Sequence, residues 1–215
     1  MADGRPGGQS VRGITIFMEG GGSALGSAAI RQGMGEFLTS ARTAARTKGI
    51  TWNLVPCGSR EGAFARFRDA VVQARGSMAH IILVDAEAAV TEADPRIHLR
   101  NQDRWDLTGV PVEAIQLMAQ IMETWIVADP KALARYYGQG FAEAKLPKRA
   151  NLEEEPKNRI LNALREATKR TQKRDYHKTK HAGTLLGQID PERVQARCRH
   201  CKRLFDELDR IIAAA

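Results

Sequence analysis

The sequence predicts an α/β protein with a mostly parallel sheet, flanked by helices and followed by a basic helical C-terminal part. Two observations support this prediction. Through about the first 130 residues, short apolar segments rich in β-branched residues alternate with helical patterns, which is typical of a parallel sheet. Beyond residue 140, helical patterns replace the strand-like segments and basic residues become frequent.

The most informative strand-like segment spans residues 80–87. Its unbroken apolar run, residues 81–84, indicates a strand buried on both faces. The run ends at Asp85, and Glu87 follows two positions later. In an extended chain such side chains point the same way, so we expect both carboxylates at the carboxyl end of a central strand, where open α/β sheets bind ligands. The alternative is that Asp85 ends the strand and caps the next helix, while Glu87 lies in solvent.

The other elements follow in chain order. Further strands are expected at residues 13–18 and 50–56 and within residues 113–121, where the strand runs into a helix. The polar residues 91–109 are expected to form a surface excursion with one helical turn. Helices are expected at residues 24–48, 61–75, 130–137, 157–170 and 182–189 and from residue 191 onward.

Length and composition are ordinary for a soluble globular protein. The chain has 215 residues, of which 43% are hydrophobic and 27% charged. We expect a cytoplasmic protein without membrane contact, because no apolar stretch reaches the ~20 residues of a membrane span and residues 1–10 lack a signal-peptide core. The expected organisation is a flexible tail (1–12), an α/β core (13–140) and a basic helical region packed on it (141–215).

Most of the formal net charge of +8 lies in one segment. Residues 145–181 hold twelve Lys and Arg against five Asp and Glu, a net charge of +7. A concentrated basic surface favours a polyanion such as nucleic acid. The alternative, which holds for most charge runs, is a solvated helical face.

Several side chains, most of them in this segment, are candidates for substrate contact. Tyr176 is expected to stack on a base, and Arg60, in the turn after the second strand, to contact the substrate. The remaining candidates are groups that titrate or bind phosphate, namely His177, Lys178, Lys180 and His181.

A further acid, Glu19, follows the first strand as Asp85 follows a later one. Since parallel strands share one carboxyl edge, Glu19, Asp85 and Glu87 are expected to converge in one crevice. Neighbouring carboxylates make each other costlier to ionise, and a divalent cation, Mg²⁺ or Mn²⁺, relieves that repulsion. The alternative is that Glu19 caps the glycine turn that follows it. Glu123 is a further candidate acid.

Two motifs suggest ligands that the rest of the sequence does not support. The glycine-rich turn at residues 20–23 approaches the Walker pattern, but Ser27 stands where that pattern needs Lys, which excludes a P-loop. The glycines still allow the backbone to approach a phosphate. Cys198 and Cys201 have the spacing of a zinc pair, but the sequence has no second pair and both lie on an apolar stripe, so packing is expected.

These motifs resemble known families. Met-Glu-Gly at Glu19 and the later Val-Asp-Ala-Glu resemble the Toprim pattern, a Glu on the first strand with Asp-x-Asp on a later one. Met-Glu-Thr-Trp-Ile-Val-Ala-Asp-Pro and Tyr-His-Lys-Thr-Lys-His resemble an uncharacterised bacterial domain-of-unknown-function family, similar in layout to RloB-like proteins with their Glu-x-Trp segment. The resemblance covers nearly the whole chain, from Ile14 to Phe205. Glu87 departs from it, because Toprim enzymes usually have Asp there.

The resemblance implies a Toprim-like (Rossmann-like) core and a metal-dependent nuclease, of a kind often encoded beside an ABC- or OLD-type ATPase in phage-defence loci. It maps Glu19 to the acid/base residue, and Asp85 and Glu87 to the metal-binding pair. The expected function is Mg²⁺- or Mn²⁺-dependent cleavage of nucleic acid phosphodiesters in anti-phage defence, with such an ATPase as partner. The alternative is a non-catalytic nucleic-acid-binding or ATPase-adaptor subunit of a defence complex. Nucleotide sensing through residues 20–23 ranks below both.

Overall fold

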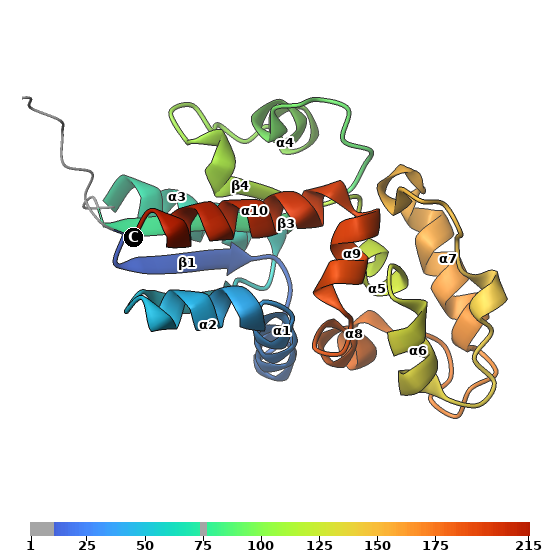
Figure 1. Ribbon diagram of the computed structural model, residues 1–215. Coiled ribbons are helices and arrows are strands. Elements are labelled where there is room, and N and C mark those ends of the chain that lie inside the picture. Colours follow the sequence, from blue (N-terminus) through green and yellow to red (C-terminus); the bar gives the residue numbers. More distant parts are fainter. Residues whose placement is uncertain (1–10, 74–76) are drawn as a thin grey trace, which may run out of the picture.

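A four-stranded parallel sheet in the order β2-β1-β3-β4 forms the centre of the computed structural model, which describes residues 11–73 and 77–215 (Figure 1). The strands are β1 (Gly13–Met18), β2 (Thr51–Pro56), β3 (Met78–Asp85) and β4 (Ile115–Met118). All three strand pairs are parallel, so the four carboxyl ends lie at one edge. The predicted α/β class with a mostly parallel sheet is confirmed.

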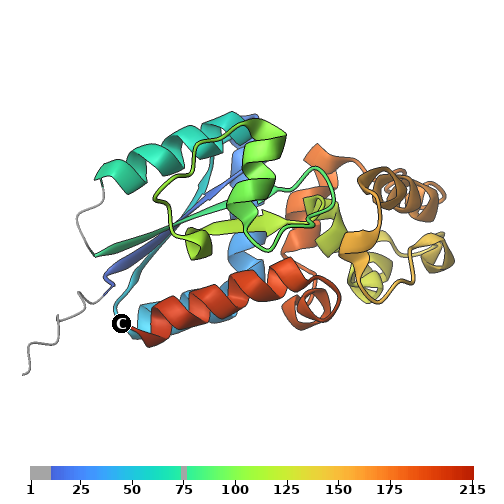
Figure 2. The same cartoon turned by 90° about the horizontal axis from the view of Figure 1, so that it is seen from above.

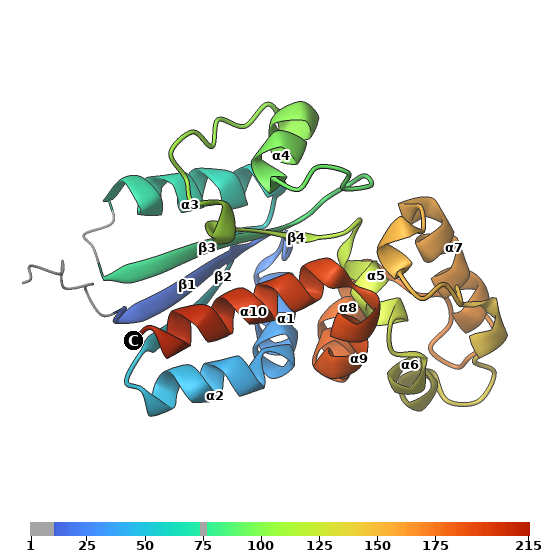
Figure 3. The ribbon, with the colours of Figure 1, turned by 45° about the horizontal axis from the view of Figure 1, so that its top comes forward.

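Helices cover both faces of the sheet, as Figures 2 and 3 show. Ile14, Ile16 and Met18 of β1 belong to the apolar cluster on one face, and Phe17 belongs to the cluster on the other. This alternation follows from strand geometry. The first face is covered by α1 (Ala24–Phe37), α2 (Thr39–Thr47) and α10 (Arg199–Ala213), and the second by α3 (Arg60–Gln73) and α4 (Pro95–Asp103).

The remaining helices gather beyond the carboxyl ends of the strands (Figure 1). One apolar cluster joins them to the sheet, because it runs from Ile14 through Leu164 and Leu185 to Ile212. The predicted basic C-terminal part therefore shares a core with the sheet. These helices are α5 (Met122–Val127), α6 (Pro130–Tyr137), α7 (Lys157–Thr168), α8 (Lys178–Leu186) and α9 (Pro191–Arg197), and the short 3₁₀ turns are η1 (Val112–Ala114), η2 (Glu143–Lys145) and η3 (Leu152–Glu154).

The structure describes most, but not all, of the segments for which the sequence predicts an element. Residues 1–10 of the predicted tail, and residues 74–75 at the end of the second predicted helix, lie outside the described residues. Within residues 11–73 and 77–215, none of the helices has the length and apolar character that crossing a membrane requires.

Three predicted elements differ from the structure. The helix predicted at residues 24–48 is two helices, because Leu38 leaves the helical conformation and is buried between them. The predicted surface excursion contains a nine-residue helix, α4, with Asp94 as N-cap and Pro95 at its first position. The last predicted helix is broken at the extended Cys198, because the carboxylate of Glu153 caps α10 through the His200 backbone N–H at 2.7 Å.

The cysteine pair is part of the core, as predicted. Cys198 and Cys201 are both fully buried, and burial is the main cause that raises the pKa of each thiol. A buried thiol with a raised pKa is a poor metal ligand and nucleophile, so these cysteines pack rather than react.

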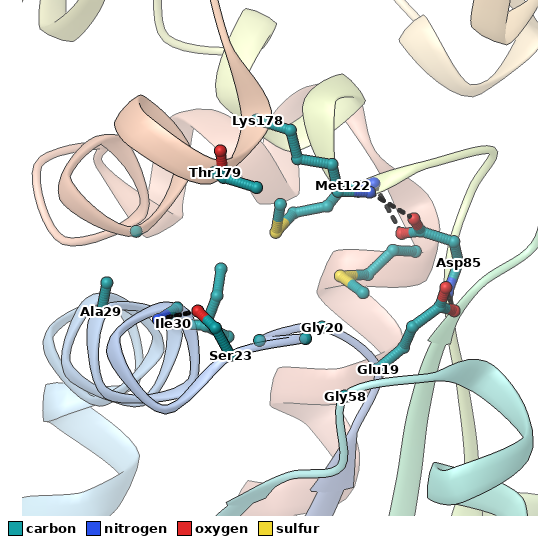
Figure 4. Close-up of a pocket in the computed structure, with 15 residues that line it drawn as sticks. Glu19, Gly20, Ser23, Ala29, Ile30, Gly58, Asp85, Met122, Lys178 and Thr179 are labelled. Atoms are coloured by element: carbon teal, nitrogen blue, oxygen red, sulfur yellow. Dashed lines mark hydrogen bonds and ion pairs between the residues drawn. The ribbon is translucent and has the colours of Figure 1, made fainter.

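Two glycines allow α8 to lie directly against α1. A Cβ added at Gly33 would approach the Gly183 carbonyl oxygen to 1.9 Å, and one added at Gly183 would be 2.7 Å from the Ala29 backbone. No side chain fits between the helices at this crossing. The contact matters for function because it places the N-terminus of α8, with Lys178, beside the carboxyl edge of the sheet (Figure 4).

This crossing predicts opposite effects for two alanine substitutions on α1. Gly33→Ala should lower the free energy of unfolding by about 1–3 kcal/mol, since the methyl group forces the helices apart. Gly35→Ala is the matched control, because its Cβ would meet nothing closer than 3.4 Å. It should be neutral or stabilising by up to about 1 kcal/mol. Urea unfolding of both variants measures the difference, and equal effects would contradict a close α1–α8 contact.

Candidate metal centre

Three carboxylates meet at the carboxyl edge of the sheet. Glu19, Asp85 and Glu87 each offer one oxygen, and these oxygens all lie within 4.8 Å of one another. Figure 4 shows Glu19 and Asp85 side by side at the strand ends. Opposite oxygens around Mg²⁺ lie about 4.2 Å apart, at twice the usual bond length. The three residues therefore fit a hard divalent cation after small side-chain movements.

The backbone conformation that brings Glu87 to this cluster differs from the predicted extended one. Strand β3 ends at Asp85, and Glu87 has a left-handed backbone conformation with φ of +63°. Its N–H donates to the Gln120 carbonyl at 2.7 Å, which fixes the turn against the segment after β4. A turn, rather than two-residue alternation along a strand, brings the two carboxylates together.

Asp85 is the buried member of the cluster, with 2% of its surface exposed. Its Oδ1 accepts the Met122 backbone N–H at 2.7 Å, and its Oδ2 lies 3.2 Å from the Lys178 ammonium (Figure 4). Burial raises the pKa of Asp85 to about 7. Lys178 opposes this rise, whereas the nearby carboxylates Glu19 and Glu123 add to it.

Arg60, predicted to contact the substrate, holds the strand ends together through its guanidinium. Its guanidinium forms two 2.7 Å hydrogen bonds with Asp103 of α4. It also donates to the Asp85 backbone carbonyl and, at 3.4 Å, to Glu19. It lies over the Trp105 ring, with 5.1 Å between the guanidinium carbon and the ring centroid. The sequence does not identify Asp103 as a site residue, because nothing in its polar surroundings marks it as the partner of a distant arginine.

Two lysines also contact the cluster. The Lys178 ammonium lies 3.2 Å from Asp85 and 3.8 Å from Glu123, and Lys157 donates to Glu87 at 2.6 Å. Burial disfavours the charge of Lys178, but the Asp85 and Glu123 carboxylates outweigh that effect and raise its pKa. Lys157 is a site residue whose sequence context indicates only that it belongs to the basic segment 145–181.

Two of the predicted substrate-contacting side chains are instead buried. His181 is 8% exposed, and its Nδ1 lies 3.0 Å from the Tyr137 hydroxyl. Tyr176 is 6% exposed and donates to Glu123 at 3.0 Å, so it is not available to stack on a base. Glu123 is itself 1% exposed; it accepts the hydrogen bond of Tyr176 and lies 3.8 Å from the Lys178 ammonium.

The exposed candidates are His177, Lys178 and Lys180. His177 precedes α8, and its Nδ1 lies 2.9 Å from the Thr179 hydroxyl. Of the twelve basic residues in segment 145–181, five are paired with carboxylates in the described part of the chain, namely Arg149, Lys157, Arg159, Lys169 and Lys178.

Two cavities adjoin the carboxylates, and Asp85 and Lys178 line both. The first, the glycine-lined cavity, holds about 360 Å³ and lies between the residue 20–23 turn, α1 and the start of α8 (Figure 4). The second, the charged cavity, holds about 410 Å³, and three cations, Lys157, Arg165 and Lys178, line it together with the carboxylates of Asp85, Glu87 and Glu123. The carboxylates therefore lie between a cavity lined mainly by small and apolar residues and one lined by both cations and acids.

The comparison with family models gives a match over residues 27–209, to a domain of unknown function, DUF4276. The chain belongs to the DUF4276 family. No curated protein and no solved structure matches it. The predicted likeness to an uncharacterised domain family is confirmed, and Asp85, Glu87 and Lys178 lie inside the matched DUF4276 region, whereas Glu19 precedes it.

The raised pKa of Asp85 predicts that the metal-free protein loses stability as pH rises. Its pKa is about 7 in the folded chain against an ordinary value of 3.8, so between these values the folded state keeps a proton that the unfolded state has released. The free energy of unfolding should therefore fall as pH rises from about 4 to about 7. Asp85→Asn should remove this fall, measured by urea unfolding in chelator, while Asp69→Asn, at an exposed position of α3, should keep it. The same pH slope in both variants would contradict the assignment.

Proposed function

We propose that this protein is a divalent-metal-dependent phosphodiesterase that cleaves nucleic acid. One observation carries the proposal: three carboxylates, Glu19, Asp85 and Glu87, converge at the carboxyl edge of a parallel sheet, beside a cavity that Lys157, Arg165 and Lys178 also line. Open α/β sheets bind ligands at this edge. Three hard oxygen donors are suited to Mg²⁺ or Mn²⁺, and the cationic side chains are suited to a phosphate backbone.

Each residue of the cluster has a proposed role. Asp85 and Glu87, with Glu19, would hold the cation, which when bound polarises the phosphate and stabilises charge on its oxygens. In hydrolysis a water oxygen bonds to phosphorus and a P–O bond breaks. Glu19 would move the proton of that exchange, since 20% of its side chain is exposed and it lines the glycine-lined cavity.

Three cations support these roles. Arg60 would position Glu19 and the end of β3, because it contacts both. Lys178 and Lys157 neutralise Asp85 and Glu87 in the metal-free protein. Once a bound metal ion neutralises those carboxylates, both lysines would contact the phosphates of the substrate from the charged cavity that they line.

The same pairs favour a second candidate function. Each carboxylate of the cluster already has a cationic partner, Arg60, Lys178 or Lys157. A closed set of ion pairs is also what a structural cluster would have, in a nucleic-acid-binding or ATPase-adaptor subunit. Metal binding separates the two, because a structural cluster has no need of the cation.

The finer proposal is a Toprim-like nuclease of anti-phage defence, similar to RloB-like and OLD-associated proteins, that acts with an ABC- or OLD-type ATPase. Its support is the resemblance of the Met-Glu-Gly and Val-Asp-Ala-Glu segments, together with the parallel sheet. The ATPase and the defence role rest on that resemblance alone.

Metal binding should depend on Asp85. We expect the wild type to bind Mn²⁺ in isothermal titration calorimetry and Asp85→Asn to lose this binding, because the substitution removes an anionic ligand but keeps an acceptor for the Met122 N–H. Asp69→Asn again serves as the charge control. Equal Mn²⁺ binding by the wild type and Asp85→Asn would favour the structural cluster.

Cleavage should depend on Glu19 more than binding does. Glu19→Gln keeps the size of the side chain but removes its basicity, so Mn²⁺-stimulated cleavage should fall on the order of 10²–10⁴-fold while nucleic acid affinity stays near that of the wild type. Plasmid, single-stranded DNA and tRNA should be compared, with and without the neighbouring ATPase if one is found. Glu92→Gln, at a partly exposed position outside the cluster, is the control. Equal cleavage by Glu19→Gln and wild type would show that Glu19 has been misassigned.

A further inference from the structure

The glycine-lined cavity has a size and lining that the proposed chemistry does not by itself require. Its volume of about 360 Å³ lies near the lower end of the range of small-molecule sites, about 300–1,000 Å³. A single base with its sugar is small enough for a cavity of this volume. A residue set that only held a cation would not need such a cavity beside it.

The cavity also has two chemically distinct ends. Figure 4 shows Glu19 and Asp85 at one end, and Ala29 and Thr179 toward the other. Apart from Lys178, its remaining lining is made of small or apolar groups, including glycine backbone and the side chains of Ile30, Met118 and Met122. Glycine backbone leaves room for a planar ring, and methionine sulfur makes favourable contacts with aromatic rings.

On these observations we propose that the glycine-lined cavity receives one unpaired base of the substrate, whose phosphodiester lies at the carboxylates. The proposal rests on the proposed function, because without a bound cation the carboxylates would repel a phosphate. The chain would continue across the charged cavity, where Lys157 and Arg165 add to the positive charge of Lys178 and which shares Asp85 and Lys178 with the first. The base would thus enter on one side of the metal centre and the next phosphates on the other.

This arrangement selects single-stranded nucleic acid. A base in a duplex is paired and stacked, and it must leave the stack before it can enter a pocket. A base in a single-stranded end or loop avoids most of that free-energy cost. We therefore expect the enzyme to prefer single strands, loops or ends over continuous duplex.

Two probes test the base pocket directly, namely adenosine 5′-monophosphate and ribose 5-phosphate, which lacks the base. Their dissociation constants for the full chain should be measured by ligand-observed NMR in Ca²⁺. The base should tighten binding by about tenfold, which corresponds to about 1.4 kcal/mol and lies within the range for stacking a base.

Thr179→Trp is expected to fill the cavity and bring the ratio of the two constants close to one. Thr184→Trp is the matched control, because Thr184 is exposed on the same helix and is outside the lining of both cavities. Gly22→Leu is a second blocking variant, since a Cβ at Gly22 would meet no atom within 4 Å. If both blocking variants keep the wild-type ratio, the base pocket is ruled out.

A ratio near one in the wild type, or no binding of the monophosphate, would also overturn the base pocket. Mn²⁺ binding and cleavage, measured on the same proteins, keep this failure separate from failure of the proposed function. If the wild type binds Mn²⁺ and cleaves duplex and single strand equally, only the base pocket fails. If it neither binds Mn²⁺ nor cleaves, the proposed function fails, whereas the ratio of the two probes still decides whether a base binds.

Discussion

The burial of one carboxylate, Asp85, connects most of the structure around the candidate site. A buried charge is unfavourable unless it is paired and hydrogen-bonded, and Asp85 receives its partners from two other elements, the first N–H of α5 and Lys178 at the start of α8. Its backbone carbonyl and N–H contact Arg60 and Glu19, which bring in α3 and the end of β1. Because α3, α5, α8 and the end of β1 all contact Asp85, the end of β3 fixes the geometry of the site.

The close contact between α1 and α8 is the second constraint, since it determines where Lys178 and Thr179 lie. The helices meet through Gly33 and Gly183, so α8 approaches the sheet edge closely enough to form one wall of the glycine-lined cavity. Lys178 thereby lies at the boundary of two cavities with different linings. An anionic substrate beside three carboxylates would need added positive charge, which the lysines supply and which the proposed cation would supply when bound.

The sequence predicted the elements whose signals are local. The apolar run before Asp85, and Glu19 after the first strand, were enough to predict a shared edge with three acids. Long-range partners had no local signal: the Arg60–Asp103 pair joins a turn to a polar segment, and the break at Cys198 depends on a cap from Glu153. The burial of His181 did have a signal. Its i, i+4 spacing to Leu185 puts it on the apolar side of α8, where burial is expected.

Whether the three carboxylates form a cation site can be seen in an anomalous difference map from crystals of the full chain grown with Mn²⁺. We expect a peak bounded by carboxylate oxygens of Glu19, Asp85 and Glu87, with the Lys178 ammonium moved away from Asp85. A fully occupied Mn²⁺ elsewhere, or no peak with Lys178 still paired to Asp85, would rule out a cation site at these carboxylates.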